Sequence, residues 1–548
     1  MKKENRRKFI LAAGATAAAA GIAGGWWWWR RLQRDEHVAH VEPPAPPDAA
    51  FPNPLRLPGA EGMYGVLDVS GPLTIVAKPV TYALLPDKPV GMYAYEVEHQ
   101  GRTYLNPLLK VRSGATFRAV FWNALEDPGI IHWHGLKVDS NNDGHPHYAV
   151  PGGATYDYQF TVANRAATYW YHPHPHPLTG KQVYLGLAGL FVVEDDEELA
   201  LQKALDLRFG ETDVPLVLQD RAFDASGWLV FGPGSDQRFH GYLGTEVLVN
   251  ATSRPHFDAA TRLYRFRILN GSNARIYRLA FRHGERLLDY HVIGADGGLL
   301  DRPYAVKEAF LSPAERMDVL LDLRNARAGD SLTLVSLSFD PMHHEAGDMG
   351  SAGHGDHAQH GAHGGGSPQD RYTPDGTEID LLKIHVRHRI AYERGVPRTL
   401  SRMAPPPAAT VAPRTITLDQ SQGVWRINGL TYDAMATPIV VKRGSTEVWE
   451  VRNVEASMPH PMHIHGFQFR VLSREGSPEQ QRRLAVAQDG LAATDLGWKD
   501  TVLSWPGETV RVVTDFSHSF LGDQVYMVHC HNLEHEDGGM MLNLKVAG

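Results

Sequence analysis

The pattern of hydrophobic and polar residues along the chain predicts β-strands almost throughout. Short runs in which apolar and polar side chains alternate recur between turns rich in Gly, Pro and Asn, and such runs are typical of half-buried strands. Three of them span residues 116–122, 264–269 and 447–452, and each is followed by an asparagine: Asn123, Asn270 and Asn453. These similar segments lie roughly 150–180 residues apart. They indicate one β-sandwich unit used three times, without long amphipathic helices.

Composition divides the chain into five segments. Residues 1–34 are expected to be an export signal or anchor, and residues 35–60 a linker, because their prolines prevent regular helix and favour extended chain. Three β-sandwich domains are expected over residues 61–205, 206–400 and 401–548. Residues 342–366 of the second are predicted to be a surface loop with too few apolar residues for a core, and they include His343, His344, His354, His357, His360 and His363.

The N-terminal segment has the features of an export signal. Arg6 and Arg7 form a twin-arginine pair, and an apolar run rich in Ala and Gly extends from Leu11 to Trp29. The pattern is similar to signals read by the twin-arginine export machinery, which moves folded proteins, and it predicts a periplasmic protein. Four tryptophans and two arginines at the end of the run are also typical of a membrane interface. Cleavage of the signal and a tether to the inner membrane are therefore both open.

The amino-acid composition then excludes several kinds of site and partner. The chain of 548 residues holds 29 histidines but one cysteine, Cys530, which excludes an intrachain disulfide and Cys-rich zinc sites. Its formal net charge is −8, and the chain beyond residue 34 is more acidic still, with no basic cluster. This charge gives no support for a nucleic-acid partner. The histidines and the lone cysteine are the residues that need an explanation.

Four motifs gather these residues, and each contains His-x-His. They are His132-Trp133-His134, His172-Pro173-His174, His463-Ile464-His465 with His460 upstream, and His529-Cys530-His531 followed by His535 and Met540. On a strand, residues i and i+2 point to the same face, so each pair presents two imidazoles side by side. Neutral imidazole suits copper, zinc, iron or nickel. One such pair is more often an ordinary pair of surface or core histidines, but four pairs, one enclosing the only cysteine, favour a metal centre.

The fourth motif separates two kinds of site. Strand alternation directs His529 and His531 to one side and the Cys530 sulfur to the other. His460 lies at an odd spacing from His463, so it can face the cysteine side. Two histidines, a thiolate and a weak axial methionine describe a blue-copper electron-transfer site, and four residues can supply it: His460, Cys530, His535 and Met540. Zinc is disfavoured because this division of ligands serves redox chemistry, which zinc lacks.

The four motifs in this order resemble those of the multicopper oxidases, in particular the bacterial laccase-like and copper-efflux oxidases. The resemblance covers about residues 60–548 and extends to the stretches 187–190, 312–316 and 497–501. It implies an all-β fold of three consecutive cupredoxin-like Greek-key β-sandwich domains. It also implies four copper ions: one type 1 ion at the cysteine site, one type 2 ion on His132 and His463, and a type 3 pair on His134, His172, His174, His465, His529 and His531. His176, which extends the second motif, is not expected to be a ligand.

The resemblance also implies a reaction. Such an enzyme couples four one-electron oxidations of its substrate to the reduction of dioxygen to two waters, with electrons passing through Cys530. Asp143 and Glu536 match acids that the family places near the copper cluster, and they are the candidate proton donors. For both residues an ordinary loop acid is the alternative.

The substrate is less determined. Copper-efflux oxidases oxidise cuprous ion through a methionine-rich insert, whereas the corresponding segment here is histidine-rich, with only Met342 and Met349. Met458 matches a methionine on the substrate side of those enzymes, but Ala456 stands where they have an acid. Cuprous ion and small phenolic compounds are therefore both candidate substrates, and copper tolerance is the expected role.

Functions without oxidase activity are the alternatives. A periplasmic copper-binding protein would use the loop histidines, and a cell-division scaffold of cupredoxin fold would have lost its copper ligands. Every ligand position is filled here, which disfavours the scaffold. Nitrite reduction is an enzymatic rival, but such chains usually have two domains and fewer His-x-His pairs. Oxygen consumption distinguishes an oxidase from the non-enzymatic alternatives.

Overall fold

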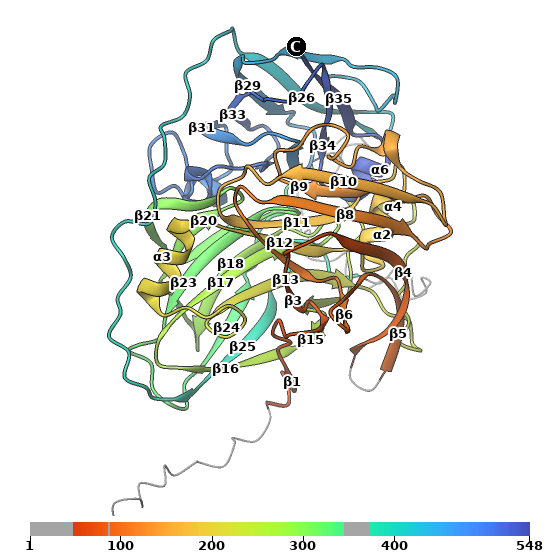
Figure 1. Cartoon of the computed structure of the whole chain (residues 1–548). Coiled ribbons are helices and arrows are strands. Elements are labelled where there is room, and N and C mark those ends of the chain that lie inside the picture. The colour runs from red at the N-terminus through yellow and green to blue at the C-terminus, as the bar shows by residue number, and fades with distance from the viewer. Residues whose placement is uncertain (1–47, 86–87, 345–371) are drawn as a thin grey trace, which may run out of the picture. The chain divides into compact units, whose positions relative to one another are not determined.

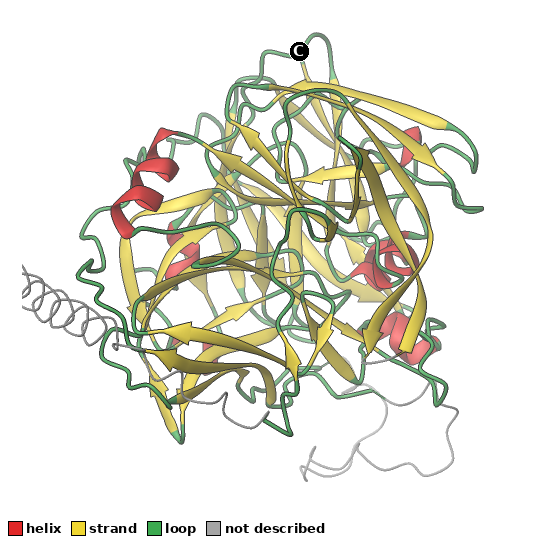
Figure 2. Ribbon diagram, turned by 60° about the horizontal axis from the view of Figure 1, so that its bottom comes forward, coloured by secondary structure: helices red, strands yellow, loops and turns green. Residues whose placement is uncertain are grey.

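The computed structural model describes residues 48–85, 88–344 and 372–548, and six β-sheets dominate this part of the chain (Figures 1 and 2). The sheets form three pairs in sequence order, and each pair surrounds a large buried hydrophobic cluster. The predicted all-β fold of three consecutive cupredoxin-like sandwiches is confirmed. The longest described helix, α3 (Asp196–Leu205), has 10 residues. The predicted signal 1–34 and most of the histidine-rich segment lie outside the described residues.

The first sandwich lies within the predicted range 61–205. In spatial order, its larger sheet consists of β10 (Thr155–Thr161), β8 (Thr116–Asn123), β4 (Leu73–Leu85), β5 (Lys88–His99), β6 (Arg102–Leu105) and β2 (Gly62–Met63). Its smaller sheet consists of β3 (Val66–Asp68), β7 (Leu108–Arg112), β12 (Gly189–Glu194), β11 (Ala167–Pro173) and β9 (Ile131–His134). Two short helices belong to its loops: η1 (Pro146–Tyr148) and α2 (Thr179–Tyr184).

The second sandwich has two larger sheets. One consists of β1 (Asn53–Pro54), β16 (Pro255–Ala260), β25 (Ile379–His388), β24 (Ser331–Ser336), β18 (Tyr277–His283) and β19 (Arg286–Leu288), with β22 (Glu308–Leu311) also paired to β18. The other consists of β15 (Thr252–Ser253), β14 (Glu246–Val249), β13 (Asp213–Arg221), β17 (Leu263–Asn270), β23 (Arg316–Asp322), β20 (Tyr290–Ala295) and β21 (Gly298–Val306). The helix α4 (Ser235–His240) follows β13.

The third sandwich has five strands in each sheet. They are β27 (Val424–Ile427), β26 (Arg414–Ser421), β29 (Thr446–Asn453), β33 (Thr509–Asp515) and β31 (Phe469–Glu475) in one sheet, and β28 (Ile439–Lys442), β35 (Met541–Ala547), β34 (Gln524–Cys530), β30 (His460–Ile464) and β32 (Thr501–Ser504) in the other. Its helices are α5 (Glu479–Arg482), η5 (Ala493–Leu496) and α6 (Leu533–Asp537).

The three asparagine-terminated strands confirm the predicted repeat. They are β8, β17 and β29, and each has one parallel and one antiparallel neighbour. Each asparagine amide donates two hydrogen bonds of 2.8–3.0 Å to backbone carbonyls: Asn123 to Asp127 and Val150, Asn270 to Arg275 and Leu311, and Asn453 to Met458 and Ser504. Each asparagine therefore ties the turn after its strand to a second segment of the same sandwich, which gives the repeat a structural reason.

Part of the predicted linker packs against the second sandwich. β1 pairs in parallel with β16, and the side chains of Phe51 and Leu55 are buried. The Asn53 amide also donates a hydrogen bond of 2.7 Å to the carbonyl of Ser253. The backbone is extended, as the prolines predict, but residues 51–55 are a sheet edge rather than a free linker. Two apolar side chains between the prolines provide the contact that composition alone did not indicate.

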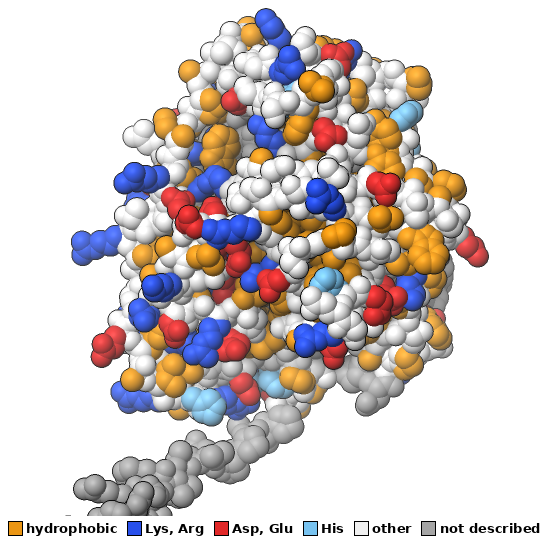
Figure 3. All heavy atoms as spheres, in the orientation of Figure 1, with side chains coloured by type: hydrophobic (Ala, Val, Ile, Leu, Met, Phe, Trp, Pro, Cys, Tyr) orange, Lys and Arg blue, Asp and Glu red, His pale blue; other side chains and the backbone are white. Residues whose placement is uncertain are grey.

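The surface carries mixed charges. On the face drawn in Figure 3, Lys and Arg side chains are interspersed with Asp and Glu over all parts of the face. None of the helices in the described ranges has the length and apolar character that a membrane crossing requires. The predicted export signal or anchor at residues 1–34 lies outside those ranges and stays a prediction.

Candidate metal centres

Two pairs of neighbouring strands bring the four histidine motifs together. In the first sandwich, β9 runs antiparallel to β11 (Figure 1). His132 lies directly opposite His172 in this pairing. In the third sandwich, β30 runs antiparallel to β34 and His463 lies opposite His529. The other four are within or immediately after these strands, and all eight side chains are fully buried: His132, His134, His172, His174, His463, His465, His529 and His531.

The eight histidines form three groups of ring nitrogens. In each group the three ligand atoms lie within 4.8 Å of one another: His132, His134 and His463; His134, His172 and His531; His174, His465 and His529. The first group holds both predicted type 2 ligands, whose Nε2 atoms are 3.4 Å apart. The other two groups divide the six predicted type 3 ligands into two sets of three. Every group combines the first and third sandwiches, so the cluster exists only where these domains meet.

Backbone carbonyls orient several of the rings. Four Nδ1–H groups donate to carbonyls at 2.6–3.0 Å: His132 to Asp143, His463 to Asp500, His172 to Pro173, and His529 to Cys530. A carbonyl only accepts, so the proton of each neutral ring is on Nδ1 and the bare nitrogen is Nε2. These rings are therefore held in one tautomer before any metal arrives.

The donor set fits copper. Burial lowers the pKa of His172 to about 4 and that of His174 to about 3, so these rings are neutral near pH 7, the form that binds metal. Among the described residues, Nδ1 of His174 and both ring nitrogens of His531 are buried without a hydrogen-bond partner. Such orphaned groups are costly unless something binds them. Neutral imidazoles in groups of three satisfy the preferences of copper.

His460, Cys530 and His535 form a separate group. The Cys530 sulfur lies 3.5 Å from Nδ1 of both histidines and accepts a hydrogen bond of 3.4 Å from the backbone N–H of Asn532. Met540 is fully buried in the same apolar cluster, and its carbonyl accepts from the N–H of Cys530. Burial raises the pKa of the Cys530 thiol, and a bound cation is what stabilises a buried thiolate. This donor set fits a blue-copper ion.

The Nε2 atoms of His460 and His535, whose Nδ1 atoms face the Cys530 sulfur, already have polar partners. The Nε2 of His460 lies 3.2 Å from the Ser457 hydroxyl, and the Nε2–H of His535 donates to the carbonyl of Phe239 at 2.8 Å. The Trp425 ring packs against both, with centroid distances of 4.7 and 5.3 Å. Sequence reasoning missed these three neighbours, and for Phe239 the reason is distance along the chain, since 296 residues separate it from His535.

The two candidate acids lie beside the histidine cluster. Oδ2 of Asp143 accepts from the Nδ1–H of His465 at 2.7 Å. The Glu536 carboxylate lies 3.5 Å from Nε2 of His174 and 3.2 Å from Nδ1 of His529. Both acids are buried, and burial raises the pKa of Asp143 well above its ordinary range. At Glu536, burial is outweighed by the neighbouring rings of His174 and His529, which hold the pKa of that carboxyl well below its ordinary range. Their positions permit proton exchange with the cluster.

Two further sequence features have clear places. His176 belongs to none of the metal groups of the described residues, and its ring packs against Tyr432 at 4.9 Å. The stretch 497–501 was singled out only by resemblance, without a role. In the structure, its residue Asp500 lies 3.0 Å from Nε2 of His134.

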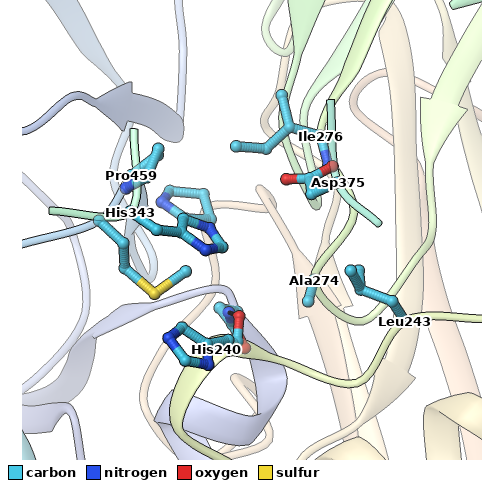
Figure 4. Close-up of a pocket in the computed structure, with 10 residues that line it drawn as sticks. His240, Leu243, Ala274, Ile276, His343, Asp375 and Pro459 are labelled. Carbon is cyan, nitrogen blue, oxygen red and sulfur yellow. Dashed lines mark hydrogen bonds between the residues drawn. The ribbon is translucent and has the colours of Figure 1, made fainter. Parts of the chain in front are cut away.

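A pocket opens beside the cysteine site (Figure 4). It is lined by the residues on either side of His460 in sequence, including Met458 and Pro459, and by His240 at the end of α4. The rings of His240 and His343 stack with centroids 5.2 Å apart and planes within 10°. The pocket therefore places two imidazoles and a thioether next to the blue-copper ligands.

Three cupredoxin sandwiches with a cysteine site next to a histidine cluster define a copper-dependent redox protein. Two family models, both described as multicopper oxidase, match residues 89–198 and 405–548. The multicopper oxidase mco of Staphylococcus haemolyticus is 30% identical over 446 residues, which cover 81% of this chain and 82% of the relative. The McoA multicopper oxidase of Aquifex aeolicus is 38% identical, with a TM-score of 0.79, over 90% of this chain and 99% of that one. A Campylobacter jejuni multicopper oxidase described as a metallo-oxidase is 27% identical, with a TM-score of 0.67, over 90% and 94%.

The chain therefore belongs to the multicopper oxidases, and it is an oxidase with copper as cofactor. It also matches the cell division protein FtsP of Xenorhabdus nematophila at 28% identity over 81% of this chain and 83% of that protein. This match is weaker than that to mco. The grouping of buried histidines with Cys530 accords with the oxidases rather than with a scaffold that has lost its ligands.

Proposed function

We propose that this oxidase takes single electrons from cuprous ion at the cysteine site and uses four of them to reduce dioxygen to two waters. Copper, when bound, supplies the one-electron redox chemistry that side chains lack. His460, Cys530, His535 and Met540 would hold a type 1 ion. His132 and His463 would hold a type 2 ion, and the six other cluster histidines would hold a type 3 pair.

The position of Cys530 carries this proposal. Its sulfur faces His460 and His535, while its sequence neighbours His529 and His531 belong to two different groups of the histidine cluster. One residue of backbone therefore links the electron-accepting site to both groups. A copper-binding protein without redox function would have no need for this direct connection.

The two buried acids are the proposed proton donors. Asp143 can hold a proton at its carboxyl oxygens, one of which is hydrogen-bonded to His465 of the cluster. Glu536 lies within 3.5 Å of His174 and 3.2 Å of His529, the other two histidines of the same group. Reduction of dioxygen to water consumes four protons, and buried carboxyls within reach of the cluster are suited to deliver them.

Occupied ring nitrogens argue against a phenolic substrate. A phenol hydroxyl would reach the type 1 ion most directly by hydrogen bonding to an outer imidazole nitrogen. His460 and His535 already use these nitrogens, with Ser457 and Phe239. A phenol would have to break one of these contacts.

The side chains that line the pocket favour cuprous ion as the substrate. Met458 offers a thioether, and His240 and His343 offer imidazoles, donors that suit cuprous ion. The metallo-oxidase from Campylobacter jejuni provides a precedent among the relatives. We further propose that the enzyme works in the periplasm, reached by the twin-arginine route with or without a membrane tether, and contributes to copper tolerance.

Oxygen uptake by the copper-loaded enzyme, with cuprous ion or a phenol as reductant, tests the proposal. The double variant His240→Ala/His343→Ala should lose about tenfold or more in kcat/KM for cuprous ion. Oxidation of the phenol should change little. No oxygen uptake by the wild type with either reductant would overturn the dioxygen chemistry.

A second histidine pair provides the matched control. His256 and His385 have ring centroids 5.7 Å apart on β16 and β25, on strands that contribute nothing to the pocket. Their double alanine variant should oxidise both reductants like the wild type. If the pocket variant loses both activities equally, or neither, the cuprous assignment is wrong.

A further inference from the structure

His134 is oriented differently from the other histidines that have assigned tautomers in the cluster. Its Nε2 lies 3.0 Å from Oδ1 of Asp500, and its Nδ1 lies 3.3 Å from Nε2 of His172. A carboxylate only accepts, so the ring proton is on Nε2 and the bare nitrogen facing the cluster is Nδ1. His132, His172 and His463 present Nε2 instead.

Asp500 itself is held in place by Arg316. The two side chains form a bidentate pair, with Nη1 2.8 Å from Oδ1 and Nη2 2.5 Å from Oδ2, and both are fully buried. The Arg316 guanidinium also donates to the carbonyls of Thr168 and Asp296. The carboxylate therefore has one orientation, with Oδ1 directed to His134.

The same residue orients a second histidine through its backbone. The carbonyl of Asp500 accepts from the Nδ1–H of His463 at 2.7 Å. The rings of His134 and His463 are stacked, with centroids 3.7 Å apart and planes within 13°. One residue of the third sandwich thus controls a stacked pair that joins the first and third sandwiches.

Gly135 makes room for this contact. Its φ of +85° lies in the left-handed region, and a Cβ there would collide with the Asp500 carboxylate and crowd Tyr169. The chain after His134 is therefore shaped to admit the Asp500–Arg316 pair.

We propose that Asp500 is a positioning residue that makes Nδ1 of His134 the metal-binding nitrogen and keeps Nε2 of His463 bare. This inference rests on the proposed copper cluster. The carboxylate acts through the two rings and contacts no substrate.

The substitution Asp500→Asn should disturb the placement of the proton on the His134 ring. If the amide keeps its oxygen toward His134, its N–H₂ faces the Arg316 guanidinium, donor against donor. If it turns, it donates to Nε2 of His134 and moves the ring proton to Nδ1, which then has no lone pair for a metal. Loss of such an outer partner typically lowers metal affinity by about 10–100-fold.

The test measures copper per chain against a competing chelator, together with the cupric EPR signal and the blue absorption. We expect Asp500→Asn to lose cluster copper at about 10–100-fold lower chelator concentration than wild type, while the Cys530 site stays blue. Asp495→Asn is the matched control, because Asp495 forms an equally buried bidentate pair with Arg474 and touches no cluster histidine. It should retain copper like the wild type.

Two outcomes overturn the inference: folded Asp500→Asn with the copper affinity and EPR signal of the wild type, or an equal loss in Asp495→Asn. If Asp500→Asn does not fold, the variant Arg316→Lys is tested instead. Lysine keeps the positive charge but cannot form the two parallel hydrogen bonds that the guanidinium donates to Asp500. Unchanged copper affinity in that variant also refutes the inference. Wild-type protein that takes up no cluster copper would instead refute the proposed function.

Discussion

A buried histidine outside the metal groups should make the protein sensitive to acid. His145 is 4% exposed, its Nδ1 accepts from the backbone N–H of His147 at 3.0 Å, and its Nε2 lies 2.9 Å from Oδ1 of Asn543 in the third sandwich. Protonation at Nδ1 would place a charge in a buried site and break the first of these hydrogen bonds. Burial, with the nearby His147 as a smaller cause, lowers the pKa of His145 to about 4, although the Asn543 contact opposes the shift.

The sign and size of the effect follow from this shift. The unfolded chain binds a proton near pH 6.5, whereas the folded protein binds it only near pH 4, so stability falls as the pH drops through this window. A difference of about 2.5 pKa units corresponds to about 3 kcal/mol of unfolding free energy, present above pH 6.5 and lost by pH 4. His145→Gln removes the titration and should therefore lose about 3 kcal/mol less than the wild type over that range.

Thermal unfolding midpoints of the copper-loaded enzyme at pH 7 and pH 4.5 measure this difference. His145→Gln should show a smaller drop in midpoint between the two conditions, whatever its stability at pH 7. His147→Gln, two residues along and exposed, is the control and should drop like the wild type. An equal drop in His145→Gln and the wild type would refute the reasoning from burial and hydrogen bonding.

Three further predictions concern single residues. Asp143→Ala should keep the blue absorption yet slow oxygen uptake, and unchanged turnover would remove its role in proton delivery. Trp425→Ala removes the ring packed on both type 1 histidines, so it should destabilise the enzyme by about 3–5 kcal/mol and alter the blue band, as thermal unfolding and absorption spectra would report. Glu198→Gln should cost about 3–5 kcal/mol in thermal unfolding, because one carboxylate oxygen accepts from Arg265 and Arg267 at 2.6 Å each; wild-type stability would contradict this.

The sequence predicted those features that depend on local periodicity. Alternation along strands was enough to place His529 and His531 on one side and Cys530 on the other, and the asparagine echo identified the three repeated strands. The grouping of the eight histidines followed only from the family resemblance, because it depends on two domains meeting. The predicted domain boundaries and copper assignments stay predictions.

Other features arise from contacts between distant segments. Asp500 and His134 are 366 residues apart, so no spacing rule could reveal which nitrogen of His134 faces the cluster. The contact of Phe239 with His535 joins α4 of the second sandwich to the third across 296 residues. The strand formed by Asn53 and Pro54 was missed for the same reason, because its partner β16 lies about 200 residues away.

The ratio of cuprous ion oxidised to dioxygen consumed tests the central claim most directly. The copper-loaded enzyme should consume one dioxygen for every four cuprous ions and release no hydrogen peroxide, and Cys530→Ser should abolish the uptake. Accumulation of peroxide at one dioxygen for every two cuprous ions would contradict the proposed reduction to water. Cuprous ion oxidised at the wild-type rate by Cys530→Ser would contradict the proposed electron path.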